Sequence, residues 1–155
     1  MAPSARKAVE LVRARRWAAL GTVGFEGPNV SFVAYAPEER LQGILMFLSG
    51  LSQHTRNLLH DARASLGVSE HDADAADPQE LARVSLYGRV GLVRRESEEF
   101  DDAWEIYRSR FPKAARLLPL FDFALFRFEI ETARFVSGFA RAATLKAGQL
   151  QAAAG

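Results

Sequence analysis

The sequence predicts a mainly β protein of the α+β class, folded as a six-stranded antiparallel barrel with peripheral helices. Six runs rich in Val, Phe, Leu and Tyr are separated by tight turns early in the chain and by helical segments later. Strict alternation of strands and helices, which a doubly wound parallel sheet requires, is missing. Closing the strands into a barrel would also remove exposed sheet edges.

Composition sets the class of protein. The 155 residues suffice for one domain with a substantial core, and 48% hydrophobic with 25% charged residues is ordinary globular composition. A net charge of +1 does not indicate the broad basic surface that binding to nucleic acid or an anionic membrane requires. The chain has no cysteine, which excludes disulfides, thiol nucleophiles and Cys-ligated metals. With no visible signal peptide and only short apolar runs, we expect a soluble cytoplasmic protein.

The first half of the chain alternates helices and strands in an irregular order. Residues 4–17 have helical apolar spacing behind Ser4 as N-cap, with a basic face that we expect to be solvated. Residues 17–39 read as two strands joined at a turn over residues 25–28, and residues 43–48 as a third strand. A short helix over residues 52–60 and a fourth strand over residues 64–70 follow.

The second half contains the longest strands. Residues 71–80, HDADAADPQE, match no calcium-loop spacing, so we expect a solvated loop without a metal. Residues 81–93 alternate cleanly, with Val84, Leu86, Val90 and Leu92 on one face, and residues 97–111 form a helix. The last strand, residues 121–139, is aromatic on both faces and therefore needs two covering layers. We expect one domain over residues 1–146 and a disordered tail over residues 147–155.

A polar cluster lies between two apolar runs in FLSGLSQHTRNLLHDARASLGV, residues 47–68. Its hydroxyl, imidazole, guanidinium and amide groups belong to Ser49, Ser52, His54, Thr55, Arg56 and Asn57. The first N–H groups of the predicted helix lack partners within the helix and carry partial positive charge, so the cluster suits a phosphate. Arg83 could add a second cation if its strand lies beside this helix. Ordinary helix capping with exposed side chains is the alternative interpretation.

Catalytic patterns are weak. The three histidines and several serines allow a Ser/His/Asp triad, but no nucleophile-elbow motif supports one. Glu129 and Glu131 share a strand face, where a salt-bridged or solvated edge is the simpler interpretation than a catalytic pair. We therefore assign no catalytic residue.

Four stretches taken together resemble the FMN-binding split-barrel superfamily, the pyridoxamine-phosphate-oxidase-like proteins, with the bacterial haem-utilisation branch as the nearest likeness. They are LGTVGFEGPNVSFVAYA, FLSGLSQHTRNLLHDARASLGV, LARVSLYGRV and FDFALFRFEIETARFVSGFARA, in order between residues 17 and 142. The second and fourth are the specific ones. The resemblance implies a six-stranded split barrel and a homodimer with FMN in each of two clefts between protomers.

The resemblance also implies which residues contact the cofactor. Those implied are Ser31, Phe32 and Val33 beside the flavin, Ser49, Ser52, His54, Arg56 and Asn57 at the phosphate, Arg83 on the long strand, and Gly138, Phe139 and Arg141 near the cleft. Where the oxidases carry Arg/Lys pairs, this chain has Ser31 and Ala36, then Gln53 and His54. The substrate-binding motifs near the oxidase C-terminus are also missing, so vitamin B6 oxidation is not expected.

The leading hypothesis is an FMN-binding homodimeric flavoprotein, an oxidoreductase of unknown substrate. The alternative is a haem-binding, haem-utilisation protein that uses the same cleft, and the deazaflavin cofactor F420 is a further ligand that the fold could hold. Members of the haem branch can use a C-terminal histidine as iron ligand, but this chain has no histidine after His71. Haem would therefore need another ligand. A cofactor-free interaction domain is a third class.

Overall fold

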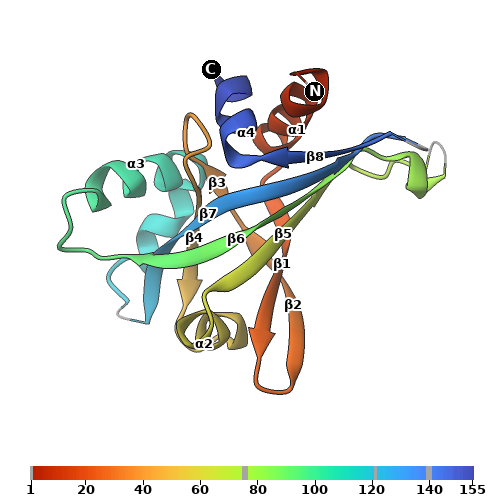
Figure 1. Ribbon diagram of the computed structural model, residues 1–155. Coiled ribbons are helices and arrows are strands. Elements are labelled where there is room, and N and C mark those ends of the chain that lie inside the picture. Colours follow the sequence, from red (N-terminus) through yellow and green to blue (C-terminus); the bar gives the residue numbers. More distant parts are fainter. Residues whose placement is uncertain (1, 75–76, 121, 139–140) are drawn as a thin grey trace.

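A computed structural model describes residues 2–74, 77–120, 122–138 and 141–155 (Figure 1). The helices are α1 (Ala2–Ala14), α2 (Gln53–His60), α3 (Phe100–Arg110) and α4 (Ala147–Ala154), with the 3-10 turns η1 (Pro78–Glu80) and η2 (Pro112–Leu117). The strands are β1 (Trp17–Gly24), β2 (Gly27–Ala34), β3 (Ala36–Pro37), β4 (Ile44–Ser49), β5 (Arg63–Ser69), β6 (Arg83–Val93), β7 (Phe123–Val136) and β8 (Ala142–Lys146).

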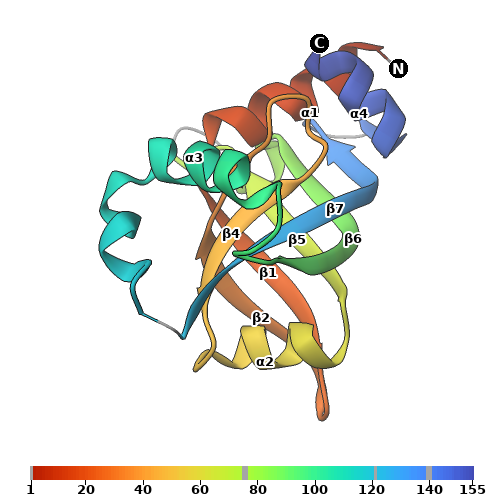
Figure 2. The same cartoon turned by 90° about the vertical axis from the view of Figure 1, so that its left-hand side faces the viewer.

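All strands belong to one antiparallel sheet in the order β2-β1-β5-β6-β7-β4-β3, and β8 also pairs with β7. The sheet curls around an apolar interior, so the predicted antiparallel split-barrel class is confirmed (Figure 2). The expected count of six strands is wrong, because β3 and β8 are additional. β3 has two residues and β8 the sequence AATLK, so neither gives an alternating apolar signal.

The interior of the barrel is closed by helices at its two ends. In α1, Ala5, Ala8, Val9 and Val12 are buried at helical spacing, and this apolar stripe covers one end. α2 lies at the other end, packed on β1 and β2 (Figure 2). None of the four α-helices in the described ranges has the length and apolar character that crossing a membrane requires.

The tail prediction differs from the structure, which places α4 over residues 147–154. The Leu150 side chain is fully buried in the barrel core, and the Arg13 guanidinium donates a hydrogen bond to the Ala154 carbonyl at 2.9 Å. Alanines around one leucine look unconstrained in sequence. Their small side chains let α4 pack closely on α1, and the Leu150 side chain is then buried in the barrel core.

A second apolar core lies outside the barrel, between the sheet and α3. Residues of β4 pack alternately into the two cores. Ile44, Met46 and Leu48 face the barrel, whereas Leu45 and Phe47 face α3. The ring of Trp104 in α3 lies 4.9 Å from that of Phe47. Burying each of these large side chains stabilises the fold by about 1.5–3 kcal/mol.

The last strand is covered on both faces, as its pattern requires, and the second cover is α3 of the same chain. Leu125 faces α3, whereas Phe126 and Phe128 lie in the barrel core, 3% and 0% exposed. Because both faces of β7 are covered within one chain, the aromatic pattern of this strand gives no evidence for a dimer interface. On β6, Val84, Leu86, Val90 and Leu92 lie opposite barrel-core residues of β7, so they share one face as predicted. Leu92, near the end of the strand, is nevertheless 45% exposed.

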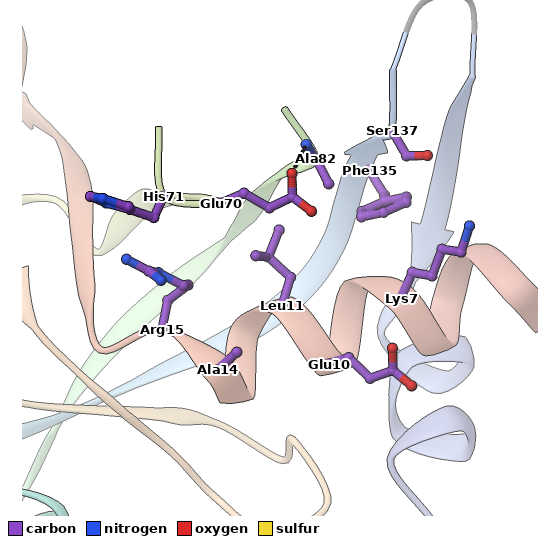
Figure 3. A pocket seen from close by; sticks show the side chains of 10 residues that line it. All are labelled: Lys7, Glu10, Leu11, Ala14, Arg15, Glu70, His71, Ala82, Phe135 and Ser137. Carbon is purple, nitrogen blue, oxygen red and sulfur yellow. Dashed lines mark hydrogen bonds between the residues drawn. The ribbon is translucent and has the colours of Figure 1, made fainter. Parts of the chain in front are cut away.

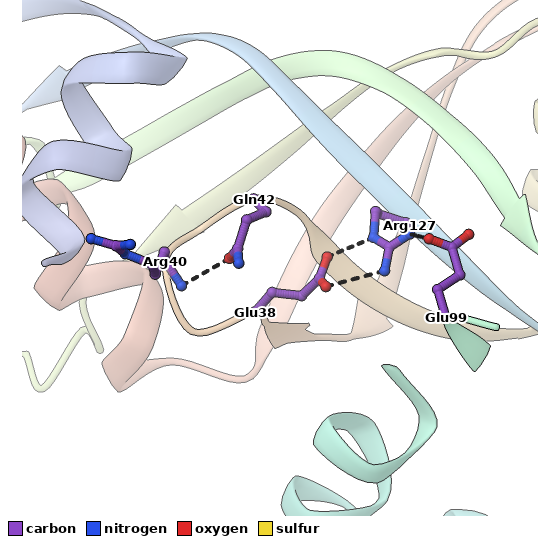
Figure 4. Close-up of polar contacts among 5 residues, drawn as sticks. All are labelled: Glu38, Arg40, Gln42, Glu99 and Arg127. Carbon is purple, nitrogen blue, oxygen red and sulfur yellow. Dashed lines mark hydrogen bonds and ion pairs between the residues drawn. The ribbon is translucent and has the colours of Figure 1, made fainter. Parts of the chain in front are cut away.

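An ion-pair link fastens the α3 layer to the sheet (Figure 4). The Arg127 guanidinium on β7 donates to both carboxylate oxygens of Glu38, at 2.6 and 3.1 Å, and to Glu99 at 2.9 Å. Hydrogen bonding to Glu38 raises the pKa of Arg127. A Cβ on Gly43 would lie 2.6 Å from the Arg127 side chain, so glycine leaves room for this link.

Candidate functional site

The predicted phosphate segment forms the α2 cluster, which we define as Ser31, Ser49, Ser52, Gln53, His54, Arg56 and Asn57. At its start, the Ser49 hydroxyl donates to the Asp122 carboxylate at 3.1 Å and accepts from the Leu51 N–H at 3.1 Å. The backbone N–H of Gly50 also donates to the Asp122 carbonyl. A carboxylate from the segment before β7 thus lies where an incoming anion would meet this hydroxyl.

The structure brings His54 and Ser31 together. The Ser31 hydroxyl lies 3.0 Å from Nδ1 of His54, across 23 residues of sequence. Both side chains are half-buried, and burial lowers the pKa of His54. The neutral imidazole therefore accepts a hydrogen bond from the Ser31 hydroxyl at Nδ1, or donates one from Nδ1 in the other tautomer, and this bond holds the ring against β2.

Asn57 has a structural environment. Its side chain is 3% exposed, donates to the Thr22 hydroxyl at 3.0 Å and accepts from Gln53 at 2.8 Å. Arg56 is exposed and bonds to the Gln53 side chain at 3.1 Å. Ser52 is the N-cap residue of α2 but makes no side-chain cap bond. The only buried side-chain oxygen without a partner in the described ranges is Oγ1 of Thr55.

A polar hollow of about 600 Å³ lies between the β1–β2 turn and α2. Gly24, Phe25, Glu26, Gly27, Pro28, Asn29, Gln53 and Asn57 line it. Its one charged lining residue, Glu26, is acidic, so the hollow offers an anion no cation of its own.

The other predicted contacts lie elsewhere. Arg83 pairs with Ser69, whereas Arg89 pairs with Arg63 just after α2, so Arg83 is at the far end of β6 from the cluster. The proposed second cation therefore does not join the cluster within one chain. Val33 is 4% exposed and packs in the barrel core.

The remaining predicted contacts, Gly138, Phe139 and Arg141, come from the segment after β7 that the resemblance places near the cofactor cleft. Phe139 lies outside the described residues. Gly138 has a φ of 68°, and the exposed Arg141 accepts the Ser137 N–H at its carbonyl, so both belong to the β7–β8 hairpin.

A second hollow, which we call the aromatic pocket, lies on the outer face of the sheet and measures about 450 Å³. It is lined by Arg15, Trp17, Ala19, Phe32, Gly67, Val68, Ser69, Glu70, His71, Asp72, Arg83, Val84 and Ser85. Its volume falls within the range of about 300–1,000 Å³ that small-molecule sites occupy.

Register explains why the sheet is hollow there. Phe32 pairs with Ala19, Ala19 with Gly67, and Gly67 with Ser85, so one row crosses four strands. Ala19, Gly67 and Ser85, the three small residues of this row, form the floor. Beside them, the rings of Trp17 and Phe32 stack with centroids 6.0 Å apart and an interplanar angle of 16°, and both are about 60% exposed.

Two arginines and an imidazole stand at the rim of the aromatic pocket. Arg83 is half-buried and its Nη1 donates to the Gln79 and Leu81 carbonyls. Among the described residues, its other guanidinium nitrogens have no hydrogen-bond partner and could meet a ligand. Arg15 and His71 also line a neighbouring hollow of about 460 Å³ beside α1. Figure 3 shows their side chains extending toward the same side, at the end of α1.

Only Phe32 and Arg83 of this pocket were predicted as cofactor contacts. Arg15, Trp17, Gly67 and His71 were missed, because they are scattered along the chain and meet only through strand register. The one sequence signal was the row of small residues at alternate positions on strands that are otherwise apolar.

Comparison with known proteins gives the family. Residues 1–150 match the family described as CREG, beta-barrel. The chain belongs to this CREG β-barrel family. In sequence it is 29% identical to the haem oxygenase HutZ of Vibrio cholerae over 135 residues, which is 86% of this chain and 76% of HutZ.

Solved structures agree with this placement. A haem-binding protein from Mycobacterium smegmatis superimposes with a TM-score of 0.86 at 27% identity; the match covers 96% of this CREG-family chain but 60% of that protein. The HutZ crystal structure, described as a haem storage protein, gives 0.71 at 27% identity, over 79% and 86% of the two chains. A pyridoxinephosphate-oxidase-family protein from Clostridium acetobutylicum shares the fold, with a TM-score of 0.69 at 16% identity over 97% and 99%. The resemblance to the split-barrel superfamily and its haem-utilisation branch is confirmed.

Proposed function

We propose that this protein binds haem in the aromatic pocket and acts in haem utilisation. The observation that carries the proposal is the pocket's combination of an exposed, stacked Trp17–Phe32 pair with arginines at its rim. Relatives described as a haem oxygenase and a haem-binding protein, at 29% and 27% identity, support it. Among the residues that line the hollow beside the α2 cluster, Phe25 is the only aromatic one.

The residues present fit haem chemically. A porphyrin has two broad apolar faces, which aromatic rings such as Trp17 and Phe32 can cover. Its propionates are carboxylates, which guanidinium groups such as those of Arg15 and Arg83 bind well. Glu70 also lines the pocket, but its carboxylate already accepts the Ala82 N–H at 2.9 Å. Bound haem would supply the redox-active iron, and the chain would supply orientation and shielding from water.

The proposal includes a homodimer. Trp17, Val30 and Phe32 leave 62%, 69% and 60% of their surface exposed on β1 and β2, and β2 is at the end of the sheet order. A second copy over this surface would bury them and cover the aromatic pocket. Val30→Asp, which introduces a charge there, should yield a smaller particle by sedimentation. Leu59→Asp on α2, also 68% exposed, is the matched control, and an unchanged dimer in Val30→Asp contradicts this seam.

Titration of the purified protein with ferric haem tests haem binding. We expect a sharp, saturable Soret band and a rise in melting temperature with haem concentration. A protein that gives neither with haem has another function. A cofactor-free interaction domain would be colourless as isolated and unaffected by haem or flavin. The cytoplasmic location expected from the sequence stays part of the proposal.

FMN is the second candidate, because Ser31 and His54 meet at the start of α2 and the Ser52 hydroxyl makes no cap bond. If the cluster holds the FMN phosphate, His54→Ala weakens FMN binding far more than riboflavin binding. Equal losses for both ligands contradict a phosphate site there. Mass spectrometry of the pigment released from the isolated protein separates FMN, the deazaflavin and haem.

A further inference from the structure

Haem in the aromatic pocket needs a ligand for its iron. Histidine, cysteine, methionine and tyrosine are the side chains that commonly ligate haem iron. The chain has no cysteine, the side chains of Met46, Tyr35 and Tyr107 are buried, and Tyr87 does not line the aromatic pocket. Met1 lies outside the described residues. The histidines are therefore the residues to compare.

Two of the three histidines are engaged away from the aromatic pocket. His54 is half-buried against the Ser31 hydroxyl at 3.0 Å. His60 is in the last turn of α2, where its ring packs on Phe25 with centroids 4.2 Å apart. Neither residue lines the pocket beside Trp17 and Phe32.

His71 lines the aromatic pocket, and its neighbours are fixed. The Glu70 N–H donates to the Ala82 carbonyl and the Glu70 carboxylate accepts the Ala82 N–H, both at 2.9 Å. On the other side, the Asp72 carboxylate accepts the Asp74 N–H at 3.0 Å. Within the part of the chain that the structure describes, the exposed imidazole of His71 itself has no hydrogen-bond partner.

We propose that His71 is the axial ligand of haem iron in the aromatic pocket, an assignment that rests on the proposed haem-binding function. A neutral imidazole presents a nitrogen lone pair to iron, and an exposed ring gives up few contacts when it binds. The clamp between Glu70 and Ala82 holds the backbone next to this ring in place. Arg15 lines the same pocket as His71, so its guanidinium could bind a propionate of the same haem.

The test replaces each histidine in turn and reads the iron coordination. His71→Ala should raise the haem dissociation constant by at least about tenfold, the low end of what metal sites lose when an outer partner is removed. It should also abolish the Fe–His stretching band of the ferrous complex in resonance Raman spectra, and added imidazole should restore that band. His54→Ala and His60→Ala, the matched controls, should keep both the affinity and the band.

The outcomes separate the two proposals. If the wild-type protein binds haem but His71→Ala keeps its affinity and its Fe–His band, the ligand assignment is wrong and haem binding stands. A band lost in His54→Ala or His60→Ala, and kept in His71→Ala, has the same meaning. If the wild-type protein itself takes up no haem, the proposed function fails together with the assignment.

Discussion

The α2 cluster and the aromatic pocket differ in how their polar groups are used. In the cluster, side chains form hydrogen bonds with one another: Ser31 with His54, and Asn57 with Gln53. In the aromatic pocket, half-buried Arg83 and exposed His71 surround a floor of small residues and an aromatic pair. The first arrangement stabilises a fold, whereas the second leaves charged and apolar groups available to a ligand.

The contrast shows that polar residues gathered in sequence can bond to one another instead of remaining available to a ligand. Neighbours along a helix find partners nearby, and buried amides must do so because an unpaired one costs stability. A site can instead be assembled from single residues on several strands. Four variants test this contrast, and they are given from the largest expected effect to the smallest.

Asn57→Ala should have the largest effect, and on stability rather than on haem binding. It leaves the buried Thr22 hydroxyl without its partner, which should lower the free energy of unfolding by about 2–3 kcal/mol. Urea denaturation measures this loss. Arg56→Ala, one residue away and exposed, is the control and should change stability by about 0.5 kcal/mol or less. Equal, small losses in both variants would show that the cluster is not structural.

Gly67→Val should fill the floor of the aromatic pocket. A Cβ at Gly67 would meet the Ala19 side chain at 3.8 Å, an ordinary contact, so the strand should tolerate it. Haem binding should weaken by about 2 kcal/mol, as when bulk is added to a packed site, while FMN binding at the α2 cluster would be unaffected. Calorimetric titration measures both ligands. Unchanged haem affinity would place haem elsewhere.

Arg83→Gln should weaken haem binding by about 1 kcal/mol, the upper end for an exposed ion pair. The loss should shrink at high salt, because ions screen the attraction to a propionate. Arg89→Gln is the matched control on the same strand, outside the pocket and exposed. A loss of equal size in both variants would mean that the effect is one of general charge.

The smallest effect concerns pH. Burial lowers the pKa of His54, so the unfolded chain takes up a proton at this residue more readily than the folded chain. The stability contributed by neutral His54 is present above the unfolded value of 6.5 and falls as the pH drops below it. Denaturation between pH 7.5 and 5 should show a decrease in the free energy of unfolding that His54→Asn reduces. An identical pH dependence in the variant would assign the titration to another group.

Much of the barrel could be predicted from apolar periodicity. The helix expected over residues 52–60 is Gln53–His60, and the strand expected over residues 43–48 is Ile44–Ser49. Local patterns could not show that Asp122 reaches Ser49 from 73 residues away, nor that α3 covers the second face of β7. The aromatic pocket depends on which residues lie opposite one another across four strands, and a single sequence does not fix that register.

α4 packs on α1, so the first and last helices of the described chain lie side by side (Figure 1). A short flexible linker could therefore join them at little cost in loop-closure entropy. New ends could be opened at the exposed β1–β2 turn, where Gly27 has a φ of 127°. Such a circular permutant would allow every strand pairing but would lack the covalent β1–β2 turn beside α2. Its stability would show whether that turn is needed for the fold to form.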